Sequence, residues 1–147
     1  MLITTKSFEG LSLLELYEIL KLRAEVFVVE QDCVYQDIDG KDQKALHVLG
    51  FEKDKLVAYT RIFPPGYYFP EAAIGRVVVR EKSRKNSFGN EILKASIQAI
   101  ERKFDTHKIK LSAQVYLTKF YENHGFHQTG EGYLEDGIPH IAMVKKN

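Results

Sequence analysis

The sequence of 147 residues has a single cysteine, no tryptophan, and no apolar run approaching the 18 or so residues needed to cross a bilayer. A lone Cys33 excludes an internal disulfide framework and favours a reducing compartment. The first residues, MLITTKSF, lack the basic and then apolar pattern of a secretory signal. From these absences we expect a cytoplasmic protein with no membrane partner.

Neither sign of charge dominates the chain. Lys and Arg number 21 against 20 Asp and Glu, for a formal net charge of +1. A chain this close to neutral has no general attraction for polyanions, so we expect no nucleic-acid partner and only local basic patches. The length suits one domain with a real core, and we expect residues 1–147 to form a single domain.

An apolar stretch near the middle of the chain is followed by a basic turn and then by a helical pattern. Ala72–Val79 ends in Val77, Val78 and Val79 without alternation, which is typical of a central strand covered on both faces. Apolar or small residues then recur with helical spacing. They are Phe88, Ile92, Ala95, Ala99, Ile100 and Phe104.

The start of this predicted helix has two unusual features. Gly89 lies in the first turn, where glycine costs up to about 1 kcal/mol relative to alanine and commonly allows something to approach the backbone closely. The preceding turn is basic, although a helix N-terminus favours acids. Its charged residues are Arg80, Glu81, Lys82, Arg84 and Lys85. Either an anion such as a phosphate binds here, or the turn is solvated and Ser87 is an ordinary N-cap.

The first helix is predicted from a capping box formed by Ser12 and Glu15, and we expect it to continue to about Val29. Its apolar stripe is expected to face the core. The residues of this stripe are Leu13, Leu16, Tyr17, Leu20 and Phe27.

The other patterns predict an α/β sandwich with a mixed sheet. We expect strands over 2–8, 45–52, 56–63, 72–79, 108–114, 126–133 and 139–144, and a short helix over 117–124 that ends at Gly125.

The polar segment 30–43 predicts a loop. Its acids, Asp37, Asp39 and Asp42, resemble a calcium loop only loosely, because Lys41 takes a ligand position and the closing glutamate is absent. The acids either receive a cationic group of a substrate or form a solvated surface loop.

Cys33 and His47 could be considered as a nucleophile and its base, respectively. Nothing in the sequence near Cys33 activates a thiol, so a packed or inert cysteine is the better interpretation.

Several motifs resemble the GCN5-related N-acetyltransferases, the GNAT superfamily. They are the central VVV, Arg84-x-x-Ser87-x-Gly89 and FYENHGF, which begins at Phe120. The segments LRAEVFVVEQ, YQDIDGKD, HVLG, IGRVVV, FYENHGF and YLEDGIPHIAM, in this order, are similar more narrowly to the ElaA branch. The resemblance covers about Leu14–Met143. It implies a GNAT-type α/β sandwich whose central mixed sheet is mostly antiparallel and flanked by helices. It also implies transfer of an acetyl group from acetyl-CoA to a primary amine of a small molecule or peptide, without a metal.

The resemblance also implies a set of residues that bind acetyl-CoA. The strand residues Val77, Val78 and Val79 would contact the pantetheine arm and the thioester, and Gln114 stands where relatives often have an asparagine that bonds the pantetheine. The pyrophosphate would be held by the loop and helix start, which comprise Arg84, Lys85, Asn86, Ser87, Phe88 and Gly89.

Two residues of this loop depart from the family pattern. Lys85 and Ser87 stand where glycines are usual, and a serine fits only if its position does not require a positive φ.

Tyr121 matches the tyrosine that many members use as a general acid to protonate the leaving thiolate. Its alternative role is core packing, which Phe120 can supply. The base that deprotonates the amine is left open by the sequence. The candidates are Glu30, Asp37, His47, Glu135 and His140. A non-catalytic acyl-CoA-binding module, for sensing or partner binding, is the alternative function. The sequence does not determine the oligomeric state, and a homodimer is compatible with it.

Overall fold

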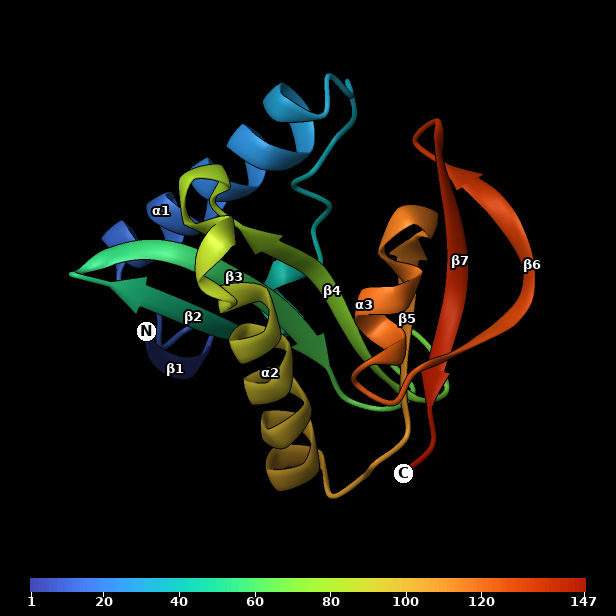
Figure 1. The fold of residues 1–147 in the computed structure, drawn as a ribbon. Helices are drawn as coiled ribbons and strands as arrows, with labels where there is room; N and C mark the ends of the chain where they lie inside the picture. The colour runs from blue at the N-terminus through green and yellow to red at the C-terminus, as the bar shows by residue number, and fades with distance from the viewer.

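The computed structural model describes residues 1–147 and contains one sheet of seven strands in the order β1-β2-β3-β4-β5-β7-β6 (Figure 1). The strands are β1 (Leu2–Ser7), β2 (Leu46–Glu52), β3 (Lys55–Phe63), β4 (Ala72–Val79), β5 (Ile109–Gln114), β6 (His127–Glu135) and β7 (Ile138–Lys145). Every neighbouring pair is antiparallel except β4 and β5, which are parallel. The predicted mixed, mostly antiparallel sheet is therefore confirmed.

The helices lie on both faces of the sheet. The helix α1 (Leu13–Arg23) covers one face, and α2 (Phe88–Phe104) and α3 (Thr118–Glu122) cover the other (Figure 1). Short 3-10 turns span Asp42–Lys44, Glu81–Asn86 and Val115–Leu117. None of the helices combines the length and the apolar character that a membrane crossing demands.

The helix α1 begins at the predicted capping box, in which the Ser12 hydroxyl accepts from the Glu15 amide at 3.0 Å and Glu15 accepts from the Ser12 amide at 2.8 Å. The helical path continues as far as predicted, but its final segment, Ala24–Glu30, winds as a π-helix.

The predicted stripe of α1 is wrong in its register. Leu13 is 88% exposed and Tyr17 is 67% exposed. The buried positions of this face, which continues into the π segment, are instead Ile19, Leu22, Arg23 and Val26. They follow the same helical spacing, but a charged residue occupies one of them, so the pattern of apolar residues alone points to the wrong face.

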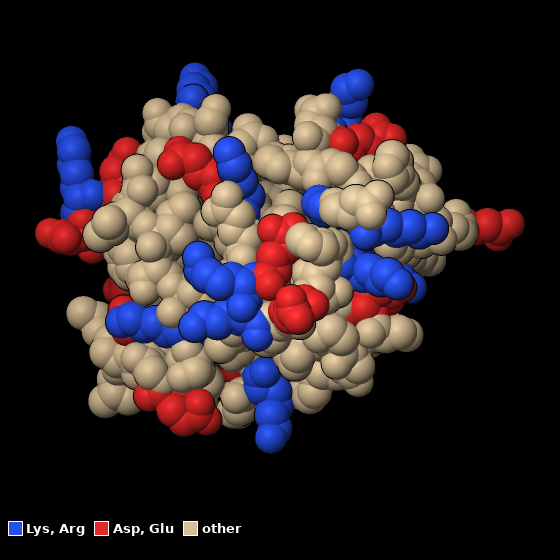
Figure 2. Space-filling model, turned by 90° about the horizontal axis from the view of Figure 1, so that it is seen from below, with Lys and Arg blue, Asp and Glu red and all other residues tan.

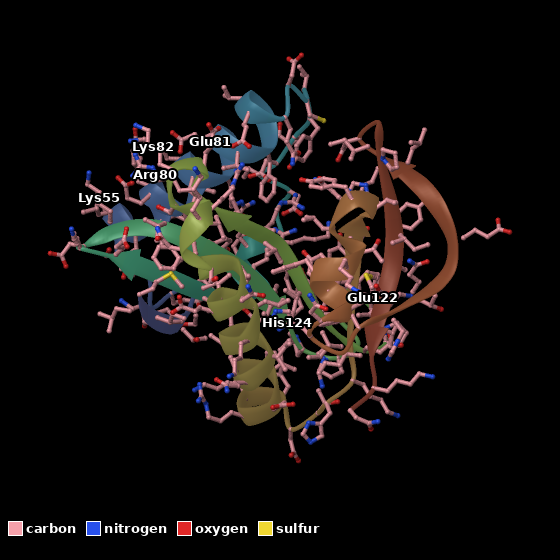
Figure 3. All side chains as sticks on the ribbon, in the orientation of Figure 1. Lys55, Arg80, Glu81, Lys82, Glu122 and His124 are labelled. Carbon is pink, nitrogen blue, oxygen red and sulfur yellow. The ribbon has the colours of Figure 1, made fainter.

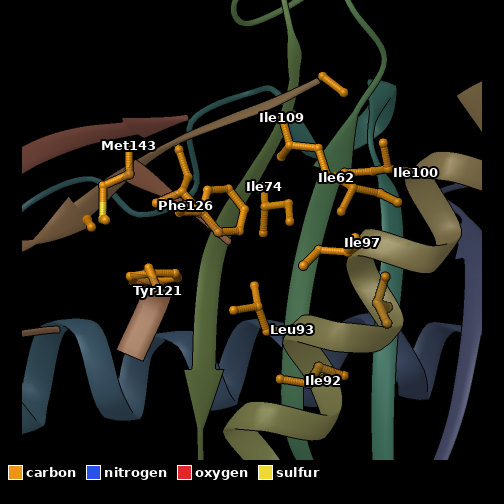
Figure 4. Close-up of a cluster of buried hydrophobic side chains, with 14 of the residues drawn as sticks. Ile62, Ile74, Ile92, Leu93, Ile97, Ile100, Ile109, Tyr121, Phe126 and Met143 are labelled. Atoms are coloured by element: carbon orange, nitrogen blue, oxygen red, sulfur yellow. The ribbon is translucent and has the colours of Figure 1, made fainter. Parts of the chain in front are cut away.

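The main core lies between the sheet and the helices α2 and α3 (Figure 4). The helix α2 buries Ile92, Leu93 and Ile100 against strand residues such as Ile74 and Ile109, much as its apolar spacing predicts. A smaller cluster joins α1 and the π segment to the opposite face. Its buried members are Ile19, Leu22, Val26, Leu49, Leu56, Tyr59 and Val78. The two clusters cover β4 on both faces, as the lack of alternation in Val77, Val78 and Val79 predicts.

The strands β4 and β5 pair only at their first residues, Ala72 with Ile109 and Ala73 with Lys110. From there they diverge, and Figure 1 shows the sheet opening between them. The edge of β4 beyond Ala73 therefore has no partner strand on this side. Because ligands of α/β proteins bind beyond the carboxyl ends of parallel strands, this opening is the natural place for a site.

The strand β4 also carries a bulge. Tyr59 pairs with Val78 and Arg61 with Gly75, so β4 has one residue more than β3 over this interval. Arg76 lies in the bulge with φ of +50°, a left-handed value that is strained for a residue with a side chain.

Candidate active site

A cleft of about 360 Å³ occupies the space where β4 and β5 diverge. It brings together most of the residues that the sequence implicates in binding acyl-CoA. These are Val77, Val78, Val79, Arg84, Gly89, Gln114 and Tyr121. The remaining loop residues do not line it, since Lys85, Asn86 and Ser87 are exposed on the loop and Phe88 is buried.

The helix α2 starts beside this cleft with unused backbone donors. Its first helical bond runs from the Glu91 amide to the Ser87 carbonyl at 3.2 Å. The N–H groups of Phe88, Gly89 and Asn90 precede that bond and have no helical carbonyl to reach. No side chain caps them. Near this end of α2, Arg80 and Lys82 project from the turn Glu81–Asn86 and its start (Figure 3). The helix start therefore retains the free donors of an anion site. Arg80 and Lys82 themselves line a different hollow, together with Glu81.

Ser87 is not an N-cap of the ordinary kind. Its φ is +59° and its ψ is +21°, in the left-handed region, and its side chain makes no capping hydrogen bond. This conformation costs a residue with a side chain about 1 to 2 kcal/mol. The loop geometry thus favours the glycine usual in relatives, and serine occupies the position at a cost.

Gly89 is not required by the protein's own packing. A Cβ atom at this position would lie 3.5 Å from Phe120 and 3.8 Å from Val79, which is ordinary van der Waals contact, and its φ is not in the left-handed region. The fold alone would accept alanine. The remaining reason for glycine is close approach of a ligand to the backbone.

Arg84 is already engaged by the protein. Its guanidinium donates to Glu30 at 2.5 and 2.8 Å and to the Val79 carbonyl at 3.1 Å. It therefore ties the π segment to the end of β4, rather than projecting freely towards a phosphate. The hydrogen bonds from Arg84 lower the pKa of Glu30 and make this carboxylate a poorer proton acceptor.

Tyr121 belongs to the main core, where its ring lies near Phe126 (Figure 4). It is 5% exposed, whereas Phe120 is only partly buried, so Tyr121 itself packs into the core and Phe120 does not replace it there. It nevertheless lines the cleft. Burial raises the pKa of Tyr121 above its ordinary value, so the hydroxyl keeps its proton at neutral pH.

A second hollow, of about 110 Å³, adjoins the cleft, and Val77, Gln114 and Tyr121 line both spaces. We call it the acceptor hollow. Two of the candidate bases, Glu135 and His140, line it.

The polar groups of the acceptor hollow form a connected cluster. The His140 Nδ1 atom lies 2.7 Å from the Ile138 carbonyl, and its Nε2 atom lies 3.4 Å from the Glu135 carboxylate. The Ser112 hydroxyl lies 2.5 Å from that of Tyr133 and donates to Glu135 at 3.4 Å. Sequence reasoning missed Ser112 and Tyr133. The alternation in β5 was the available signal for Ser112, because Leu111 and Ala113 are buried on the opposite face.

Asp37 and His47 lie elsewhere. His47 is fully buried, with Nδ1 2.6 Å from the Tyr59 hydroxyl and Nε2 2.9 Å from the Asp42 carbonyl. Burial lowers the pKa of His47, and neither it nor Asp37 lines the cleft or the acceptor hollow. His47 also makes no contact with Cys33, whose thiol instead donates to the Asp136 carbonyl at 3.2 Å.

Segment 30–43 is largely a loop, as predicted, but its acids Asp37, Asp39 and Asp42 bond arginines of the same chain and are not free to receive a cationic group of a substrate. Their partners are Arg23, Arg61 and Arg76, at N–O distances of 2.5 to 3.4 Å. Burial alone would raise the pKa of Asp39, but hydrogen bonds from Arg61 outweigh it and lower that pKa. These carboxylates are paired with arginines, and no group of His, Cys, Asp and Glu converges as a metal site requires.

Charge is evenly distributed over the face seen in Figure 2, where basic and acidic side chains lie interspersed. This face presents no broad surface of one sign, in keeping with the net charge of +1.

The fold is that of acyl-CoA N-acyltransferases. The crystal structure of such an enzyme from Pseudomonas aeruginosa matches with a TM-score of 0.92 and 39% identity over 99% of both chains. A sequence model of the acetyltransferase (GNAT) domain matches residues 8–147, and the chain belongs to this family.

The narrower resemblance to ElaA is confirmed as well. Protein ElaA of Escherichia coli (strain K12) is 41% identical over 138 residues, which cover 92% of this chain and 90% of ElaA. The crystal structure of Escherichia coli ElaA matches with a TM-score of 0.92 and 38% identity over 99% of both chains. An aminoglycoside 6'-N-acetyltransferase complexed with coenzyme A shares the fold, with a TM-score of 0.69 and 16% identity.

Proposed function

We propose that residues 1–147 form a single-domain, cytoplasmic N-acetyltransferase that transfers the acetyl group of acetyl-CoA to a primary amine of a small molecule or peptide by direct attack. Membership of the family supports acyl transfer. The choice of acetyl as the acyl group and of a primary amine as the acceptor is the proposal. The observation that supports it best is the convergence on one cleft of Gly89 at the free helix start, the unpaired edge of β4 and Tyr121.

The cleft suits a long thioester ligand with a diphosphate. In this proposal the N–H groups of Phe88, Gly89 and Asn90 hold the diphosphate, and the unpaired edge of β4 bonds the amide groups of the pantetheine arm. Acetyl-CoA supplies the activated acyl group. A backbone N–H of the segment 77–79 stabilises the oxyanion that forms when the amine attacks.

Tyr121 is the proposed general acid. Its buried hydroxyl remains protonated at neutral pH and lines the space shared by the cleft and the acceptor hollow. From there it would protonate the departing thiolate.

The proposed base is His140, with Glu135 beside it. These two residues line the acceptor hollow together with Tyr121, whereas Glu30, Asp37 and His47 are bonded to other groups of the protein. If Nδ1 of neutral His140 donates to the Ile138 carbonyl, the lone pair of Nε2 faces Glu135. Nε2 would accept the proton of the amine, and Glu135 would stabilise the resulting imidazolium.

Calorimetric titrations with acetyl-CoA, CoA and ATP, followed by thiol-release assays over a panel of amines, test the proposal. We expect both CoA ligands to bind more tightly than ATP. Tyr121→Phe should keep CoA affinity within about twofold and lower the rate by about 10² to 10⁴. A protein that binds CoA but acetylates no amine would be the non-catalytic module. One that ignores CoA at millimolar concentration would contradict both functions.

A further inference from the structure

A smaller hollow of about 80 Å³ lies beneath the segment that joins β3 to β4. It shares lining residues with the acceptor hollow, so the two spaces adjoin each other. The shared residues are Ile74, Gly75, Arg76, Ser112 and Glu135. The far wall of the smaller hollow is aromatic and consists of Phe63, Tyr68 and Phe69.

Gly75 leaves this space open. A Cβ atom built on Gly75 would meet no atom within 4 Å, and its φ lies outside the left-handed region. Glycine weakens a strand interior because it has no side chain to pack and loses more backbone entropy on folding. Neither the backbone conformation nor the packing of the protein therefore explains glycine at this position. A ligand that occupies the space beside the strand would explain it.

Within the aromatic wall, Tyr68 has the exposed ring, whereas Phe63 is buried. The rings of Phe63 and Tyr68 are stacked, with centroids 5.5 Å apart and planes inclined by 26°, and Tyr68 meets Phe69 edge to face at 4.9 Å. Tyr68 is 45% exposed, so part of its ring is available for contact. A flat aromatic group is the ligand that such walls favour.

The charges around the smaller hollow favour an uncharged group inside it. Arg61 and Arg76 line it, but both guanidiniums are paired with Asp39. Glu135, on the side shared with the acceptor hollow, is the acid that lines the space and can attract an ammonium group. A ligand that bridges the two hollows would thus place its amine beside Glu135 and an uncharged end beyond Gly75.

We propose that the smaller hollow is an aromatic subsite, defined by Phe63, Tyr68, Phe69 and Gly75, that binds the non-reacting end of the acceptor. The preferred acceptors are primary amines that carry an aromatic ring. This inference rests on the proposed function, because it assumes that the amine reacts beside Glu135 and Tyr121.

The test compares 2-phenylethylamine with ethylamine, which is too short to extend beyond Gly75, by their kcat/KM in the thiol-release assay. The wild-type protein should prefer 2-phenylethylamine by about tenfold or more, since a buried ring contributes more than one factor of ten in affinity. Gly75→Val fills the open space and should abolish this preference, because it should lower kcat/KM for 2-phenylethylamine at least tenfold more than kcat/KM for ethylamine. Gly75→Ala, whose Cβ the structure accommodates, should give an intermediate loss.

Tyr68 offers a matched pair of variants. Tyr68→Leu removes the ring and should lower kcat/KM for 2-phenylethylamine by about 2- to 10-fold. Tyr68→Phe keeps the ring and should retain the wild-type kcat/KM for 2-phenylethylamine. Equal loss for both amines in Gly75→Val, or no preference for the ring in the wild type, overturns the subsite.

A binding measurement separates this inference from the proposed function. 2-Phenylethylamine is titrated calorimetrically into wild-type and Gly75→Val protein, each saturated with CoA. Binding that Gly75→Val weakens tenfold supports the subsite even if no amine is acetylated, in which case the proposed function alone fails. Absence of binding to the wild type, with ethylamine still acetylated, overturns the subsite and leaves the transferase intact.

Discussion

Replacing Gly89 with alanine should separate the stability of the fold from the binding of acyl-CoA. The structure accommodates the added methyl group at 3.5 Å from Phe120, so no clash opposes the substitution. Alanine is the better helix former by up to about 1 kcal/mol. The free energy of unfolding should therefore rise by up to that amount, which corresponds to an increase in Tm of up to about 3 °C for a chain of this size.

The same methyl group should weaken CoA binding. It would stand beside the N–H groups of Phe88, Gly89 and Asn90, which the proposed function assigns to the diphosphate. Hydrogen bonds to a charged group contribute about 1.5 to 3 kcal/mol each. Loss of one such bond corresponds to a Kd that is higher by about 10- to 100-fold.

Thermal unfolding of the free protein and calorimetric titration with CoA measure the two effects on the same sample. Asn90→Ala is the matched control, because it changes the same turn without adding a Cβ atom, and its Kd should stay within about twofold. A Gly89→Ala protein that binds CoA as tightly as the wild type would refute the assignment of the diphosphate to this helix start.

The remaining predictions concern backbone strain, acid stability and the base. Ser87→Gly should raise the free energy of unfolding by about 1 kcal/mol, measured by denaturant titration, because glycine adopts the left-handed conformation without strain but loses more backbone entropy. Folding lowers the pKa of His47 below its ordinary 6.5 and the pKa of Asp39 below its ordinary 3.8. Each group therefore contributes to the free energy of unfolding at a pH above its ordinary pKa, and this contribution is lost as the pH falls through the folded pKa. The free energy of unfolding should thus begin to fall below about pH 6.5 and fall again below about pH 4, and Asp39→Asn should flatten the second fall; a flat profile between pH 7 and 3 would contradict this. His140→Gln should lower kcat/KM by about 10² to 10⁴ at pH 7 and recover towards pH 10, where the amine loses its proton unaided, whereas Glu135→Gln should have a smaller effect; equal profiles for His140→Gln and the wild type would exclude His140 as the base.

Local patterns predicted those parts of the fold in which neighbouring residues determine the structure. The strand Ala72–Val79 and the helix Phe88–Phe104 were predicted with the bounds that the structure has, because a mostly apolar run and a regular helical stripe each reflect burial directly. The buried face of α1 was not predicted correctly, because Arg23 is buried there. A buried arginine depends on carboxylates 14 and 19 residues away, and no periodicity of apolar residues contains that information.

The residues of the candidate site also divide into those that the local sequence identifies and those that only the fold identifies. Gly89 could be singled out because its cost to a helix is a local property. The engagement of Arg84 by Glu30 spans 54 positions, and the contact between Ser112 and Tyr133 spans 21, so both require the fold. The left-handed conformation of Ser87 was likewise hidden, because serine rarely adopts it and the sequence offered only the family's glycine as a hint.

The acids of segment 30–43 act on the cleft through β4 rather than through a substrate. Asp37 accepts from Arg76 at 2.8 Å and from Arg23 at 2.9 Å, so it joins α1 to the bulge of β4. Breaking a buried pair by removal of one partner costs about 3 to 5 kcal/mol, which exceeds the roughly 1 to 3 kcal/mol of strain stored in a left-handed residue. The ion pairs can therefore hold Arg76 at its positive φ, and with it the backbone of Val77 at the edge of the cleft. In the folded chain, these negatively charged residues therefore support the strand that lines the cleft.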